Sequence, residues 1–313
     1  MISPICPVVS TIYCFLDPSV LVGAEGYFVF SLGDDQVQDN VECGATFCLG
    51  TASATNNTNL ERPSDDKIYT VVGIYLGCIA VATCIVAFGL ESLKSYNESC
   101  KDRKINSASP IELLTITLKM CRHPNILLLI PLTIWSGMEQ SFFMADYTAA
   151  YVSCARGICY IGYVTVCFGV TDVLSASLTG PLGKALGRVP MISFAAALQV
   201  ASIVTLLCWK PSLRDKAILF VISGLWGTTD GILSVQSNAL YGIFFPGQEE
   251  GAYNNFSFWY ASGFVVNFAY SSYLCTHIKL YILLAVTLFG LLGYYAVEWL
   301  ERNKERKSIY FVN

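Results

Sequence analysis

Four acidic side chains lie inside or at the edges of long apolar segments, where they could bind a proton or a cation. They are Glu139, Asp146, Asp172 and Asp230. A carboxylate near the centre of a bilayer costs about 2.5–3.5 kcal/mol on insertion scales. A membrane protein therefore retains such groups where they face other helices or a water-filled cavity. The functional hypothesis is a proton- or cation-binding cavity. The alternatives are hydrogen bonding between helices, or helix ends that lie in water.

Asp230 also begins a polar stripe along its segment. Ser234, Ser237, Asn238 and Tyr241 follow it at helical spacing. We expect these side chains to line the same polar cavity as the carboxylates.

The segments that carry Glu139 and Asp230 resemble each other weakly. Trp135-Ser-Gly-Met-Glu139 and Trp226-Gly-Thr-Thr-Asp230 each place a tryptophan four residues before an acid. Each motif opens a set of three apolar segments, so the second set is inverted relative to the first. This arrangement is typical of secondary transporters, whose sites lie near the bilayer midplane between repeats.

The composition is that of a membrane protein. Of 313 residues, 54% are hydrophobic and only 13% are charged, against about 25% in soluble domains. This disfavours a large soluble helical domain, and the net charge of −4 gives no sign of direct nucleic-acid binding. The two histidines, His123 and His277, have no nucleophile–acid set near them, and motifs such as HExxH and GxSxG are absent. We expect no catalysis, no metal and no cofactor.

The elements that must position the acids are apolar helices. We expect a doubtful partial span at 1–33, an extracellular or lumenal loop at 34–66, a transmembrane helix at 67–90, a cytoplasmic linker at 91–123, six helices within 124–300 and a cytoplasmic tail at 301–313. The six helices are expected at Pro124–Tyr151, Ile158–Thr179, Val189–Trp209, Ala217–Phe245, Ala252–Cys275 and Leu280–Leu300.

Two signals set the orientation of this multi-pass protein. Most Lys and Arg residues fall in the linker, the tail and the 180–188 connection, which predicts a cytoplasmic C-terminus. The glycosylation sequon at Asn56 then lies on the opposite side. We expect residence in the plasma membrane or an endomembrane. The seven clear spans also allow a seven-helix receptor, but the glycosylated internal loop and the intramembrane acids disfavour it.

Two cysteine pairs flank or occupy short polar loops, unlike most of the thirteen cysteines. Cys43 and Cys48 form one pair, and Cys154 and Cys159 form the other. Four residues separate the members of each pair, which is not zinc-knuckle spacing. If both loops face an oxidising compartment, disulfides can form within or between them.

The connection Gly180-Pro-Leu-Gly-Lys184-Ala-Leu-Gly187-Arg188 is similar to the signature loop of the major facilitator superfamily. Its glycines permit a tight reversal, and Arg188 can meet lipid phosphates. Lys184 occupies the position where that loop usually has Asp, so the resemblance does not extend to a charge relay.

Several longer motifs resemble one family in particular. They are CGATFC at 43–48, RPSDDKIYTVVGIYLG at 62–77, IPLTIWSGMEQSFFMADYTAAYVSCARG at 130–157, GYVTVCFGVTDVLSA at 162–176, LWGTTDGILSVQSNALYGIFF at 225–245 and KLYILLAV at 279–286. Together they are similar to the Unc-ninety-three family of ion channel regulatory proteins, and to its A-type animal members most of all.

The resemblance implies an all-α polytopic bundle of major-facilitator type. It further implies that the chain corresponds to the C-terminal six-helix half and one or two preceding spans, as expected of a truncated gene model or splice form. It also implies a protein that regulates or escorts other membrane proteins, such as two-pore potassium channels in one branch and Toll-like receptors in another. A proton- or cation-coupled solute carrier of the major facilitator type is the alternative.

Overall fold

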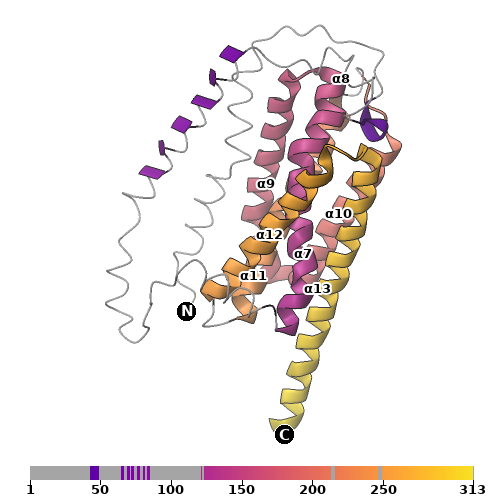
Figure 1. Ribbon diagram of the computed structural model, residues 1–313. Coiled ribbons are helices and arrows are strands. Elements are labelled where there is room, and N and C mark those ends of the chain that lie inside the picture. Colours follow the sequence, from indigo (N-terminus) through magenta and orange to yellow (C-terminus); the bar gives the residue numbers. More distant parts are fainter. Residues whose placement is uncertain are drawn as a thin grey trace.

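The computed structural model describes residues 43–48, 65–66, 69–70, 72–73, 76–77, 80–81, 83–84, 121, 123–212, 216–245 and 249–312. Within these ranges the regular structure is entirely helical (Figure 1). The expected partial span at 1–33, the sequon at Asn56 and the linker at 91–120 lie outside the described residues, as does much of the helix expected at 67–90.

The helical elements, labelled as in Figure 1, follow one another with short connections. They are the 3₁₀ turn η1 (Gly44–Thr46), α7 (Pro124–Phe142), the π-helix η3 (Phe143–Ser153), α8 (Cys154–Arg156), α9 (Cys159–Leu186), α10 (Arg188–Cys208), α11 (Lys216–Phe244), α12 (Glu249–Ser271) and α13 (Thr276–Val312). The elements α7, η3 and α8 form one continuous rod.

Five of these helices are long and apolar enough to cross a bilayer, as far as the described residues go. They are Pro124–Arg156, Tyr160–Leu186, Arg188–Cys208, Lys216–Phe244 and Thr276–Lys304. The helix α12 has a comparable 23 residues, but Asn, Ser and aromatic residues make it less apolar. Apolar helices of this length span the hydrocarbon core. The prediction of an all-α polytopic membrane protein is therefore confirmed.

The bundle is arranged around α7. This helix packs against α12 and α13, while α9 and α11 form the closest helix pair and α10 packs on α11 and α13. Trp135, Met138 and Phe142 of α7 are at most 1% exposed. At the opposite end from η1, α13 extends beyond its neighbours (Figure 1).

Glycines allow the closest helix contacts. A Cβ atom added to Gly227 of α11 would lie 2.3 Å from the carbonyl oxygen of Phe168 on α9. A Cβ on Gly231, one turn later, would lie 2.5 Å from the carbonyl oxygen of Asp172. Small residues at such spacing let transmembrane backbones approach closely. The pair Gly227 and Gly231 thus sets the distance between α9 and α11.

We expect Gly227→Ala to destabilise the bundle by about 1–3 kcal/mol, because the new methyl group overlaps backbone that must shift. The control is Gly224→Ala on the same helix, where a Cβ meets only the Thr171 Cγ2 at 3.5 Å and the Cys167 Sγ at 3.9 Å. There the higher helix propensity of alanine should leave stability equal or greater. The thermal unfolding midpoint in detergent is measured for both variants. Equal midpoints would refute the close approach of α9 and α11 at Gly227.

One connection is tighter than expected. Gly180–Leu186, expected as part of a loop, forms the last turns of α9, and Pro181 lies inside the helix. Only Gly187 leaves the helical conformation, with φ of +89°, a region that glycine enters without steric cost. Its amide donates to the Gly183 carbonyl oxygen at 3.0 Å. A single glycine therefore reverses the chain between α9 and α10.

Candidate functional site

A buried ion pair joins η3, α12 and α13. Lys279 Nζ lies 2.6 Å from Asp146 Oδ1, and both side chains are 2% exposed. Asp146 also accepts hydrogen bonds from Ser271 Oγ at 2.6 Å and from Asn267 Nδ2 at 3.2 Å. Lys279 donates a second bond to the Ser271 carbonyl oxygen at 2.6 Å. A buried pair whose other hydrogen-bonding groups are satisfied is held in place, so this pair fixes the three elements together.

The π-helix that carries Asp146 is tied to two further helices. Tyr147 donates from its hydroxyl to the carbonyl oxygen of Leu219 on α11 at 2.8 Å, and Tyr151 donates to that of Leu206 on α10 at 2.7 Å. The two rings stack with centroids 5.7 Å apart. The hydrogen bonds of Tyr147 and Tyr151 thus anchor the stretch of backbone that carries Asp146. Because π-helical turns are rare and occur frequently at functional sites, this stretch is a candidate site.

A second polar group lies on α7, where the motif that ends at Glu139 meets the motif of α11 that ends at Asp230. Trp226 Nε1 donates to the Glu139 carbonyl oxygen at 3.1 Å. Glu139 is 0% and Asp230 4% exposed. Gln140 Nε2 donates to Asp230 Oδ2 at 3.2 Å, and the hydroxyl of Tyr260 on α12 donates to Gln140 Oε1. The helices α7, α11 and α12 thus converge on this group.

The carboxyl of Glu139 has that of Asp230 as a neighbour, and Asp172 is a further acidic neighbour. Among the described residues no N–H or O–H group donates to either Glu139 side-chain oxygen. Two adjacent carboxylates do not both stay charged in a buried site. The arrangement can therefore hold one proton between them, or a cation.

The polar stripe of α11 is divided. Tyr241 is buried and its hydroxyl lies 3.0 Å from Thr133 Oγ1 on α7. Ser234 is exposed, and Asn238 donates to the Ser234 carbonyl oxygen at 2.8 Å within its own helix. Asp230 and Tyr241 therefore face α7. Ser234 and Asn238 lie away from the Glu139 and Asp230 carboxyls.

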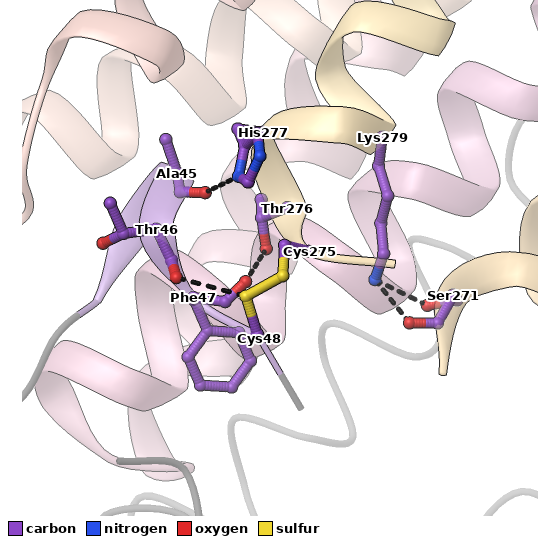
Figure 2. The surroundings of a disulfide bond; sticks show 9 residues. All are labelled: Ala45, Thr46, Phe47, Cys48, Ser271, Cys275, Thr276, His277 and Lys279. Atoms are coloured by element: carbon purple, nitrogen blue, oxygen red, sulfur yellow. Dashed lines mark hydrogen bonds between the residues drawn. A yellow bond between two sulfur atoms is a disulfide. The ribbon is translucent and has the colours of Figure 1, made fainter. Parts of the chain in front are cut away.

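Two disulfides fasten the loop at 43–48 to the bundle. Cys43 bonds to Cys154 and Cys48 bonds to Cys275. Figure 2 shows the second bond beside Thr276, whose amide and hydroxyl both donate to the Phe47 carbonyl oxygen at 3.0 Å. The loop thereby links the end of the α7–α8 rod to the start of α13.

In Figure 2, Lys279 points away from the Cys48–Cys275 bond and toward Ser271. The disulfides and the Asp146–Lys279 pair therefore strengthen the same end of the bundle by separate contacts. The side chain of Cys159, the fourth cysteine of the two predicted pairs, lies outside the described residues.

The segment that resembles the facilitator signature lies at the opposite end. Gly180 is exposed, and a Cβ atom added there would meet nothing within 4 Å. Lys184 is exposed as well. Arg188 lies over the ring of Phe244, 5.7 Å from its centroid, and its Nη2 is 3.8 Å from Glu298 Oε2. This segment is remote in the bundle from Asp146 and its partners.

Within the described ranges, no group of three or more His, Cys, Asp or Glu side chains is arranged as a metal-binding cluster. Sequence reasoning missed several residues of the polar groups and disulfides, among them Gln140, Tyr260, Asn267, Ser271, Lys279 and Cys275. Cys275 could have been found from the sequence, because it ends an expected span next to a short polar turn. Cys154 was selected for a similar position beside a short polar loop.

Comparisons with known proteins agree with the residues that carry the resemblance. The family model described as ion channel regulatory protein UNC-93 matches residues 9–295. Protein unc-93 homolog A of Bos taurus is 40% identical over 275 residues, which cover 88% of this chain and 59% of the relative. The Homo sapiens homolog A is 39% identical over 259 residues, 83% of this chain and 56% of the relative.

A nematode protein is more distant. The putative potassium channel regulatory protein unc-93 of Caenorhabditis elegans is 32% identical over 269 residues, 85% of this chain and 37% of the relative. The chain thus spans less than two thirds of the length of the curated relatives it matches.

Proposed function

Because the chain belongs to the UNC-93 family of ion channel regulatory proteins, we propose that it binds another membrane protein, an ion channel, and changes that channel's delivery or activity. The match over residues 9–295 is the observation that carries this proposal. A potassium channel is the first choice of partner, since the nematode relative is named as a putative regulator of one. A membrane receptor is the second choice of partner.

The outer surface of the bundle suits such a role. Large apolar side chains on the helices point outward, for example Val265 and Phe268 of α12, which are 67% and 50% exposed. The charged groups of Asp146 and Lys279 are enclosed instead. An apolar exterior at lipid depth can meet acyl chains or the helices of a partner.

The disulfides support the proposed orientation. Disulfides persist in oxidising compartments, so the end with Cys48 and Cys275 should face the lumen or the exterior. Arg302 and Lys304 lie at the far end of α13 and should face the cytosol. Both features favour a cytoplasmic C-terminus, in the plasma membrane or an endomembrane.

The test is a recording of potassium current. The chain is co-expressed with two-pore potassium channels, and whole-cell current and surface channel density are compared with cells that express the channel alone. We expect one of these quantities to change for at least one channel. The Lys279→Met variant, which is expected to be strongly destabilised, is the control for overexpression. If the chain altered neither quantity for any channel of the panel, the potassium-channel proposal would fail.

A second candidate function is a proton- or cation-coupled solute carrier. The observation that favours it is the Glu139–Asp230 group, where a buried carboxyl lacks a hydrogen-bond donor in the part of the chain that the structure describes. Ser136 and Ser237 also have buried hydroxyls with no partner there. Buried polar groups of this kind can accommodate a proton, water or a cation.

Glu139→Gln separates the two functions. The amide has nearly the shape of the acid and can donate to Asp230, so we expect an unfolding midpoint at or above that of the unmodified chain. Asp146→Asn is the matched control on the same rod, and it should destabilise because Lys279 loses its charged partner. If the chain regulates a channel, the Glu139→Gln variant should still change the potassium current. A carrier shows proton flux into proteoliposomes that Glu139→Gln abolishes, an outcome that would favour the second function.

A further inference from the structure

A groove lies between α9 and α10, with α11 as its floor. Its volume is about 500 Å³, within the range of about 300–1,000 Å³ that ligand sites occupy. Its walls include Leu178, Leu182 and Leu186 of α9 and Phe194 of α10. These side chains are 42–60% exposed, so the groove opens on the outer surface of the bundle.

The polar groups in the groove are already satisfied. Ser175 donates to the Asp172 carbonyl oxygen at 2.9 Å, Thr179 to that of Ser175 at 2.7 Å, and Thr228 to that of Gly224 at 2.8 Å. Ser175 Oγ also lies 3.5 Å from the Gly227 carbonyl oxygen on α11. All three hydroxyls therefore have acceptors within the bundle, and the groove offers little to a polar ligand. Its occupant must be an apolar chain.

The length of the groove matches one leaflet of a bilayer. From Ser175 to Leu186 the helix rises by about 16 Å at 1.5 Å per residue, and half of a hydrocarbon core is about 15 Å. Both walls belong to helices that are long and apolar enough to cross a membrane. The opening is therefore continuous with the surface that faces lipid, and it runs from mid-membrane toward the end at Gly187.

A cationic group follows directly at that end. Arg188 lies between two residues of the groove wall, Leu186 and Pro190. Its side chain is 32% exposed, and its guanidinium lies over the ring of Phe244 at this end of the bundle. The nearby Glu298 carboxylate is 3.8 Å away, beyond hydrogen-bond distance. A part-exposed guanidinium at the membrane surface is suited to a phosphate.

From these observations we infer that the groove is a phospholipid site in the leaflet where α9 ends. One acyl chain lies along Leu178, Leu182 and Phe194, and the lipid phosphate accepts a hydrogen bond from Arg188. The lipid thereby fills the gap between α9 and α10, which contact each other less than either contacts α11.

Photo-crosslinking tests this site. The chain is reconstituted in vesicles of phosphatidylcholine that contain a phosphatidylcholine with a photoactivatable acyl chain, and labelled peptides are mapped by mass spectrometry. We expect labelling concentrated on 175–194, and a loss of at least about fivefold in Leu178→Trp because the larger ring fills the groove. Leu174→Trp is the matched control, since both leucines are 57% exposed on the same helix and only Leu178 lines the groove.

A separate variant tests the proposed contact between Arg188 and the lipid phosphate. Arg188→Gln should lower labelling of the same peptides severalfold, while Lys304→Gln, at an exposed lysine on the same side of the bundle, should not. If Leu178→Trp and Leu174→Trp labelled alike, the lipid would be part of the general annulus and the inference would be overturned. Unchanged labelling in Arg188→Gln would remove the assigned role of the guanidinium.

Discussion

Replacing Lys279 with methionine is expected to lower the stability of the bundle by about 3–5 kcal/mol, because it leaves the Asp146 carboxylate buried without its counter-charge. The lysine and the carboxylate are 2.6 Å apart and both 2% exposed, so water cannot replace the missing ammonium. The measurement is the temperature at which detergent-solubilised protein loses its monodisperse peak in size-exclusion chromatography.

Two controls make this prediction specific. Lys304→Met on the same helix removes a lysine that is 63% exposed and paired at the surface with Glu301, a contact worth about 0–1 kcal/mol. The double variant Asp146→Asn with Lys279→Met removes both charges and should recover part of the loss. A single Lys279→Met variant as stable as Lys304→Met would contradict the role given to the pair.

Removal of the Cys48–Cys275 disulfide should cost about 2–5 kcal/mol. The bond joins residues 227 positions apart, so it restricts the unfolded chain over most of its length. The variant is Cys48→Ser with Cys275→Ser, measured by the same thermal assay.

The exposed free cysteine Cys208 supplies the control, as Cys208→Ser. That variant should unfold at the temperature of the unmodified chain and migrate with it in a non-reducing gel. If Cys48 and Cys275 of protein purified from membranes reacted with maleimide before reduction, the assigned disulfide would be refuted.

The fold class could be predicted because membrane helices carry a strong compositional signal. Low charge and long apolar segments predicted a polytopic helical protein, which the five apolar helices confirm. Helix ends were harder to place. The rod that begins at Pro124 continues through a π-helix to Arg156, and α9 continues past Gly180 and Pro181 because tertiary packing outweighs their helix-breaking tendency.

The site was harder to predict than the fold. An acid inside an apolar segment stands out in the sequence, whereas the residue that pairs with it does not. Glu139 and Asp230 are conspicuous inside apolar segments, and the structure buries both. Lys279 was overlooked, since a lysine at a helix start looks like a residue whose ammonium reaches water. Only the packing of α12 against η3 brings Asn267 and Ser271 to the same carboxylate, and no local pattern encodes that contact.

Binding to a channel is tested most directly by site-specific photo-crosslinking on the outer faces of α9, α12 and α13. A photoreactive amino acid replaces exposed apolar residues one at a time, among them Val170, Val265, Phe268 and Leu292, in cells that express the potassium channel whose current responds. We expect covalent adducts with the channel at a contiguous set of positions, and none when the probe replaces the buried Leu132. Adducts with lipid alone at every exposed position would contradict the proposal that the chain acts by direct contact with a channel.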